Sequence, residues 1–137
     1  MKRTEIPYAL KREVDLSYEE ADRRIREELA AQGFGVLTEI DVRATLRNKL
    51  DVEFPPYVIL GACNPSLAHR ALLAEPDIGL LLPCNVVVRR DESSGTTIVE
   101  AMDPGPMIDL AGNDGLNEVA AEARSRLETA LNRVAGA

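Results

Sequence analysis

The first third of the chain passes from an alternating pattern of apolar and polar residues to a helical one. The larger apolar residues of Tyr8–Leu16 share one parity, which predicts a strand with one solvated face. Ser17 and Glu20 then have the spacing of a capping box, which marks the start of a helix. Gly33 is well placed to end that helix. The apolar stripe of the helix consists of Tyr18, Ala21, Ile25 and Leu29.

The middle of the chain alternates further strands with short helices. Asp41 is expected to cap a helix over Val42–Leu50, in which apolar residues recur at a spacing of four. Tyr57–Cys63 is a continuous apolar run, which indicates a buried strand. The segment Phe34–Val42, which precedes the predicted helix, has the alternating pattern of a strand. The residues expected to share one face of that strand are Phe34, Val36, Thr38, Ile40 and Val42.

A third helix is predicted directly after the buried strand. Asn64 is a favourable capping residue, and Pro65 suits the first helical position because its missing N–H is not needed there. This helix must end by Pro76. Its inward face is expected to carry Leu67, Ala68, Ala71 and Leu72.

The last third of the chain predicts a hairpin, a loop and a long helix. Cys84–Arg90 and Thr96–Met102 flank a turn and are expected to pair as strands. Asp103–Pro106 is read as a rigid loop, and Asn113 or Asp114 is expected to cap the final helix. One face of that helix carries Leu116, Val119, Ala120, Ala123, Leu127, Ala130, Leu131 and Val134.

Together these elements predict an α+β fold with two layers, in which a mostly antiparallel sheet is packed by a long C-terminal helix. The length of 137 residues fits a single domain spanning 1–137, and 45% apolar with 28% charged residues is ordinary for a globular protein. The net charge of −7 argues against a nucleic-acid or anionic-membrane partner. Met1–Tyr8 lacks the apolar region of a secretory leader, so we expect a cytoplasmic protein.

One segment of the chain stands out because it is almost free of charge. Pro56–Val88 contains only three charged residues, together with both cysteines and the single histidine. Cys63 lies just before a predicted helix N-terminus, where the helix dipole favours a thiolate. The candidate pocket or thiol site therefore comprises Cys63, Asn64, His69, Pro83, Cys84 and Asn85.

Several chemistries are open for these residues. The cysteines are buried hydrophobes, a reactive pair, or part of a pocket wall. A soft-metal site would combine them with His69 and with Met102 or Met107, but a C-x-x-C pair is absent. A hard-cation site would use acidic loop residues that match no calcium-loop spacing, namely Asp103, Asp109 and Asp114. No cofactor is indicated by these patterns.

Four sequence blocks carry a resemblance to a known family. They are Gly33–Val42, Lys49, Ile59–Pro65 and Ile78–Cys84, within a match from about Ser17 to Met107. Here the sequence resembles the domain of unknown function 302 family. The resemblance implies a small α+β fold of the TATA-binding-protein-like kind, with one strand, a helix, four strands and a helix in order, and a homodimer. It implies no established reaction, cofactor or catalytic residue.

Two functions compete on this basis. The first is a dimeric binding or interaction module, without catalytic activity, whose ligand pocket lies near Asn64, Pro83, Cys84 and Asn85. The second is a thiol-dependent protein that handles sulfur, redox equivalents or a soft metal through Cys63, Cys84 or both. A hydrolase or transferase that uses loop carboxylates has no supporting motif. We therefore expect a binding protein rather than an enzyme.

Overall fold

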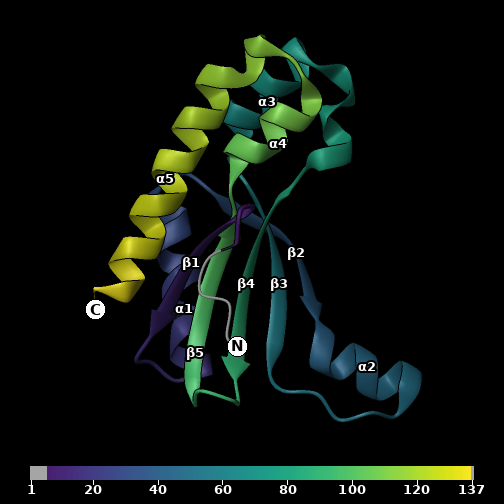
Figure 1. The fold of residues 1–137 in the computed structure, drawn as a ribbon, viewed down its shortest axis with the longest axis vertical. Coiled ribbons are helices and arrows are strands. Elements are labelled where there is room, and N and C mark those ends of the chain that lie inside the picture. The colour runs from purple at the N-terminus through teal and green to yellow at the C-terminus, as the bar shows by residue number, and fades with distance from the viewer. Residues whose placement is uncertain (1–5, 137) are drawn as a thin grey trace.

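The computed structural model describes residues 6–136, so the leader expectation for Met1–Tyr8 concerns residues that lie mostly outside the described part. Its five-stranded sheet has the order β1-β5-β4-β3-β2, and all neighbouring strands are antiparallel. Figure 1 shows the sheet running from the middle to the lower end of the molecule. The strands are β1 (Ala9–Val14), β2 (Gly35–Asp41), β3 (Tyr57–Cys63), β4 (Cys84–Asp91) and β5 (Thr96–Met102).

The helices fall into three groups (Figure 1). Helices α1 (Tyr18–Ala31) and α5 (Asn117–Ala135) pack on each other and on the sheet. A second group lies beyond the upper end of the sheet: α3 (Pro65–Ala74), the 3₁₀ helices η1 (Pro76–Leu81) and η2 (Asp114–Leu116), and α4 (Pro104–Ala111). The short helix α2 (Val42–Leu50) projects beyond β2. None of the helices within residues 6–136 has the length and apolarity needed to span a bilayer.

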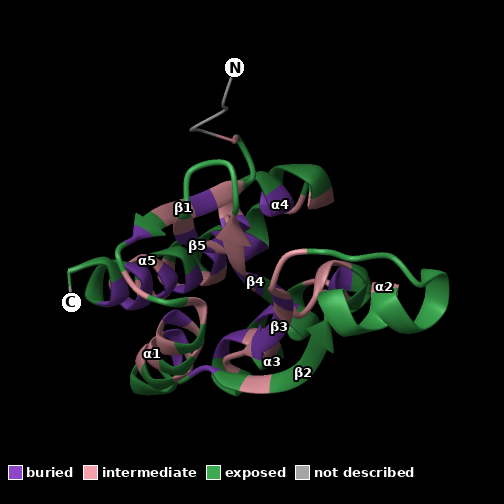
Figure 2. Cartoon of the chain, turned by 90° about the horizontal axis from the view of Figure 1, so that it is seen from below, coloured by how far each residue is buried: buried purple, intermediate pink, exposed green. Residues whose placement is uncertain are grey.

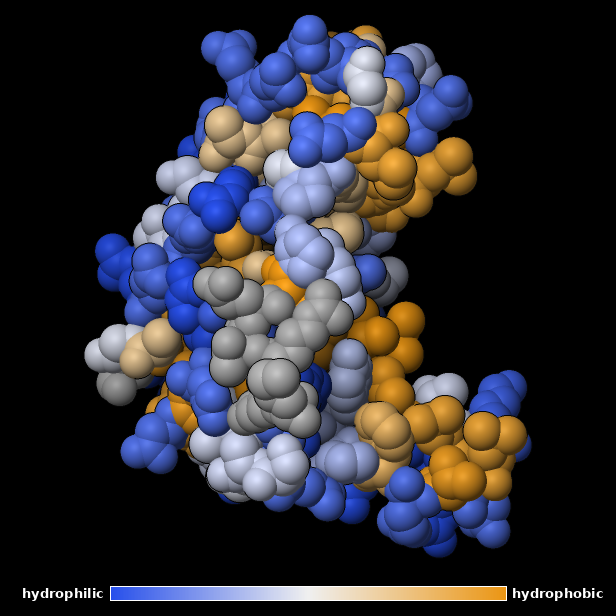
Figure 3. All heavy atoms as spheres, viewed as in Figure 1, coloured by the Kyte–Doolittle hydropathy of each residue, from blue (hydrophilic) through white to orange (hydrophobic). Residues whose placement is uncertain are grey.

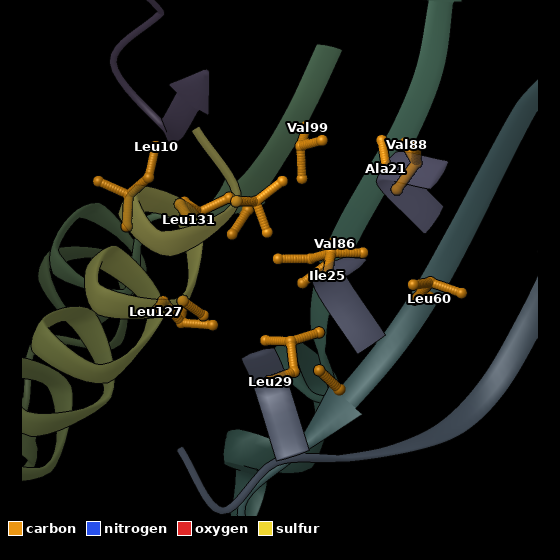
Figure 4. Close-up of a cluster of buried hydrophobic side chains, with 14 of the residues drawn as sticks. Leu10, Ala21, Ile25, Leu29, Leu60, Val86, Val88, Val99, Leu127 and Leu131 are labelled. Carbon is orange, nitrogen blue, oxygen red and sulfur yellow. The ribbon is translucent and has the colours of Figure 1, made fainter. Parts of the chain in front are cut away.

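The main core lies between the sheet and the pair α1 and α5 (Figure 4). The predicted stripe of α1 buries Ala21, Ile25 and Leu29, and α5 adds Leu127 and Leu131. Each large side chain buried in this way contributes about 1.5–3 kcal/mol of transfer free energy. The two-layer α+β fold with a long C-terminal helix is thereby confirmed.

A β-bulge in β2 overturns the predicted face of that strand. The register shifts between Val36 and Thr38, after which Glu39 pairs with the fully buried Leu60. Glu39 therefore shares the helix-covered face and forms an ion pair with Arg26 of α1. Ile40 turns to the other face and is 49% exposed. The predicted alternation was wrong from Thr38 onward because a bulge moves every later side chain to the opposite face.

The predicted loop at Asp103–Pro106 is instead the start of α4. The Asp103 side chain caps this helix by accepting a hydrogen bond from the Gly105 N–H at 2.9 Å. Pro104 and Pro106 sit in the first turn, where the backbone N–H groups have no intrahelical partner. Two prolines and a glycine thus begin a helix here rather than prevent one.

A second, smaller core joins the helices beyond the end of the sheet. It contains buried side chains from α3, η1, α4, η2 and α5, namely Ala71, Ile78, Ile108, Leu116 and Ala120. On α3, Leu67 and Ala71 are buried as expected, but Leu72 is 42% exposed. The prediction that Leu72 faces the core was wrong because Leu72 lies at the solvent-exposed margin of a cavity that Leu67 and Ala71 also line.

Candidate functional site

An apolar cavity of about 360 Å³ lies between the upper end of the sheet and helices α3, α4 and α5. An apolar cavity of only ~150 Å³ is enough to bind benzene, so this one accommodates a considerably larger molecule. None of the described residues that line it carries a charge. Its wall includes Ala62, Cys63, Leu67, Cys84, Met107 and Ile108.

Asn64 positions one side of this pocket. Its Oδ1 accepts the Leu67 N–H at 3.2 Å and so caps α3 as predicted, while its Nδ2 donates to the Gln32 carbonyl at 3.3 Å. The same carbonyl accepts a hydrogen bond from Arg126 of α5 at 3.2 Å. The end of α1, the start of α3 and the middle of α5 are therefore tied together at one carbonyl oxygen.

Asn113 holds the opposite end of α3. Its Nδ2 donates to the Ala74 carbonyl at 3.0 Å, and its Oδ1 accepts the Gly115 N–H at 2.9 Å. The side chain therefore caps η2, which leads into α5, and also links that turn to α3. The two ends of α3 are thus fixed by asparagine side chains that satisfy backbone groups.

Close packing around Gly61 positions Pro83, which belongs to the pocket wall. A Cβ at Gly61 would lie 2.1 Å from the Thr38 Oγ1 and 2.8 Å from the Pro83 Cγ. Thr38 of β2 and Pro83 can approach β3 this closely only because residue 61 has no side chain. Pro83, which follows a cis peptide bond, is placed against the strand and contributes to the pocket wall.

Both cysteines are free thiols, and both line this pocket. Cys63 is half-buried at the end of β3, whereas Cys84 is buried at the start of β4. Burial, with a smaller effect from the nearby Cys63, raises the pKa of Cys84 to about 11. The Cys84 thiol is therefore protonated at neutral pH and is a poor nucleophile.

The other candidate residues lie apart from this pocket. His69 is exposed on α3, and Asn85 is exposed on β4. Successive strand residues point to opposite faces, so Asn85 faces away from Cys84. Asn85 instead borders a separate hollow with Tyr57 and Arg89. Of the six candidates, the pocket brings together Cys63, Asn64, Pro83 and Cys84.

The suggested metal ligands do not converge. Within residues 6–136, no group of three or more His, Cys, Asp or Glu side chains is placed to hold a metal ion. Asp103, one of the suggested cation ligands, caps α4 and pairs with Arg124 of α5 at 3.2 Å. The Asp103 carboxylate therefore already has a hydrogen-bond donor and an ion-pair partner within the protein.

Several pocket residues were not identified from the sequence. Met107 and Ile108 were missed because the start of their helix, Asp103–Pro106, was interpreted as a loop and no helix was predicted after it; Phe34 and Leu37 were missed because they were assigned to a strand. The apolar run after Pro106 was the available signal for α4. Leu116 and Ala120 were expected on the core face of the last helix, without any indication that this face also borders a cavity.

Comparisons with known proteins agree with this architecture. The family model described as "Domain of unknown function DUF302" matches residues 10–134. A crystal structure of an uncharacterized conserved protein DUF302 from Bacillus stearothermophilus superposes with a TM-score of 0.86 and 32% sequence identity. That alignment covers 93% of this chain and 98% of the other. None of the curated proteins matches the chain. The chain is therefore a member of the DUF302 family.

Proposed function

We propose that this protein binds a small, neutral, apolar molecule in the pocket between the sheet end and α3, α4 and α5. The observation that carries the proposal is a cavity of about 360 Å³ whose described lining residues are uncharged and almost entirely apolar. Ligand pockets typically measure ~300–1,000 Å³ and are lined mainly by hydrophobic side chains. The volume and the chemistry of the wall both fit this class of site.

The polar groups of the wall favour a neutral ligand. Asn64, the lining residue with the strongest hydrogen-bonding groups, already uses its Oδ1 and Nδ2 within the fold. A carboxylate or ammonium would lose its hydration without gaining a charged partner, at a cost of several kcal/mol. Binding then depends on the removal of apolar surface from water, worth roughly 25 cal/mol per Å².

A second candidate function is thiol chemistry, which is favoured by the presence of both cysteines on one pocket wall. The raised pKa of Cys84 leaves Cys63 as the residue that would carry such a function. This function requires a thiol that reacts in the folded protein. If both cysteines resist alkylation until the protein is denatured, the thiol function is excluded and pocket lining is their role.

We also propose that the protein works as a homodimer in the cytoplasm. The two free thiols support this compartment because cytosolic proteins keep their cysteines reduced. The dimer is supported by large apolar side chains that remain exposed in one chain, among them Leu50 and Leu80. The acidic net charge of −7 supports the absence of a nucleic-acid partner.

The ligand site is tested with N-phenylnaphthylamine, a neutral fluorescent probe. Ala68 lines the pocket on α3 and is half-buried, so Ala68→Trp fills the cavity without replacing a core residue. Ala30→Trp on the exposed side of α1 is the matched control. We expect saturable fluorescence enhancement for the natural protein and the control, and at least tenfold weaker binding for Ala68→Trp. Equal binding by all three proteins would place the probe elsewhere, and no saturable binding would contradict the proposal.

A further inference from the structure

The exposed apolar side chains gather along one side of the molecule. Of the ten large apolar residues that are exposed within the described residues 6–136, eight belong to β2, α2 with the loop after it, α3 and η1. Figure 1 places α2 beyond the lower end of β2, with α3 and η1 at the upper end. Figure 3 shows the molecule hollowed on this side, with apolar regions above and below the hollow.

We name the two regions by their residues. The lower patch comprises Ile40, Leu50, Val52 and Phe54, which are 38–66% exposed. The upper patch comprises Leu37, Leu72 and Leu80, which are 42–88% exposed. The helix α2, which bears part of the lower patch, has no buried residue, and Figure 2 shows it mostly exposed. An amphipathic helix of this kind is normally stabilised by packing its apolar side on another surface.

The outer edge of strand β2, which lies between the two patches, is not paired with another strand among the described residues. β2 pairs only with β3, so its outer edge presents unpaired backbone groups. The opposite edge, β1, carries three consecutive charged residues over 11–13, which discourage association. β2 contains two charged residues, of which Glu39 pairs with Arg26 and Asp41 caps α2. β2 therefore carries fewer of the charges that normally protect an edge strand than β1 does.

The charges on the two sides of the hollow are complementary. Helix α2 contains Arg43, Arg47 and Lys49 and no acidic residue. Within the described part of the chain, Arg43 and Lys49 form no ion pair. The segment 71–82, which includes η1, contains Glu75 and Asp77 and no basic residue. A basic apolar helix and an acidic apolar segment thus flank one concave side.

Taking the ligand site and the homodimer as proposed, we infer that a second copy of this chain docks on this side through a two-fold axis. The two-fold axis places α2 of each copy against the upper patch and η1 of the other. Such an isologous interface requires that the same surface contain both halves of the contact. The lower patch with its basic helix and the upper patch with its acidic segment meet that requirement.

The same arrangement covers the entrance of the ligand pocket. Leu37 and Leu72 belong to the upper patch and also line the pocket. A partner helix placed on these two leucines shields the pocket from water, so the site is complete only in the dimer. Dimer formation and affinity for an apolar ligand are therefore coupled.

Molecular mass in solution tests the interface without any ligand. The natural protein is expected at twice the chain mass of 15.0 kDa, measured by light scattering after size exclusion. Leu50→Glu changes a side chain that is 66% exposed and is expected to shift the protein to the monomer. Leu110→Glu, 77% exposed on α4 and outside both patches, is the control and should remain dimeric. A monomeric natural protein, or a dimeric Leu50→Glu variant, would overturn the inference.

A charge exchange tests which surfaces meet. The double variant Arg43→Glu/Lys49→Glu and the single variant Asp77→Lys should each dimerise at least tenfold more weakly than the natural chain. Mixed together they should form a heterodimer, because each altered surface then faces one of opposite charge. A mixture that stays monomeric, or variants that dimerise normally, would contradict the two-fold arrangement.

The probe separates failure of the interface from failure of the ligand site. The monomeric Leu50→Glu variant should bind N-phenylnaphthylamine about tenfold more weakly, equivalent to about 1.4 kcal/mol. A dimer that binds no probe refutes the ligand site and leaves the interface standing. A monomeric natural protein that binds the probe refutes the interface and leaves the ligand site standing.

Discussion

Cys84 shows how position, rather than residue type, decides the chemistry of a thiol. Its pKa is raised from 9.0 to about 11, so the thiolate fraction in the folded protein is about a hundredfold smaller than in the unfolded chain. In a Cys63→Ser variant, where Cys84 is the remaining thiol, we expect iodoacetamide at pH ~8 to react about a hundredfold more slowly with folded than with urea-denatured protein. Equal rates in the two states would show that Cys84 is not protected.

The same shift predicts a pH dependence of stability. Between pH 9.0 and about 11 the folded protein keeps the Cys84 proton that the unfolded chain loses. The unfolding free energy therefore falls as pH rises through this window, by at most about 2–3 kcal/mol. Urea denaturation at both ends of the window measures it. Cys84→Ala should reduce this dependence and Cys63→Ala should keep it; an unchanged slope in Cys84→Ala would assign the effect to other groups.

Gly61 is a residue whose absent side chain allows Thr38 and Pro83 to pack closely on β3. An added Cβ would lie 2.1 Å from the Thr38 Oγ1 and 2.8 Å from the Pro83 Cγ, so the strand or the proline must move. We expect Gly61→Ala to lower the unfolding free energy by about 1–3 kcal/mol in chemical denaturation. Gly79→Ala in η1 meets no atom within 4 Å and should cost less than about 0.5 kcal/mol. Equal stabilities of the two variants would contradict the close approach.

At the scale of elements, α2 and α3 both have a side-chain N-cap, but only α3 has buried residues. Asn64 caps α3 and also bonds the Gln32 carbonyl, whereas Asp41 caps α2, which has no buried residue. Asn64→Ala should lower the global unfolding free energy by about 1–2 kcal/mol. Asp41→Ala should change it by less than about 0.5 kcal/mol and increase amide exchange within α2. The reverse order of costs would show that α2 is part of the cooperative core.

Most elements could be predicted from local patterns. The bounds of α2, β3 and β5 agree with the expected Val42–Leu50, Tyr57–Cys63 and Thr96–Met102. The bulge in β2 was not predictable because its pairing partner, β3, is distant in sequence and determines the register. Helix α4 was missed because proline is read as a helix breaker, although in the first turn it is compatible with a helix.

At the scale of the whole molecule, the pocket arises where two cores fail to merge. The larger core fills the space between the sheet and α1 and α5, and the smaller one joins the helices beyond the sheet end. The charge-poor segment pointed to this region, and Cys63, Asn64, Pro83 and Cys84 do line the cavity. Its remaining wall comes from Phe34, Leu37, η2, α4 and α5, whose contribution could not be predicted because they are distant from that segment in sequence. Local sequence patterns therefore identified one wall of the pocket, but not the residues that form its other walls.

The central claim, that an apolar ligand occupies this pocket, is tested most directly by the two described methionines. Met107 is buried and lines the pocket, whereas Met102 is half-buried and borders a separate hollow. With ¹³C-methyl methionine and assignment by Met107→Leu, N-phenylnaphthylamine should shift the Met107 methyl resonance saturably and leave that of Met102 in place. A shift at Met102 alone, or no shift at either methyl at saturating probe, would contradict the claim.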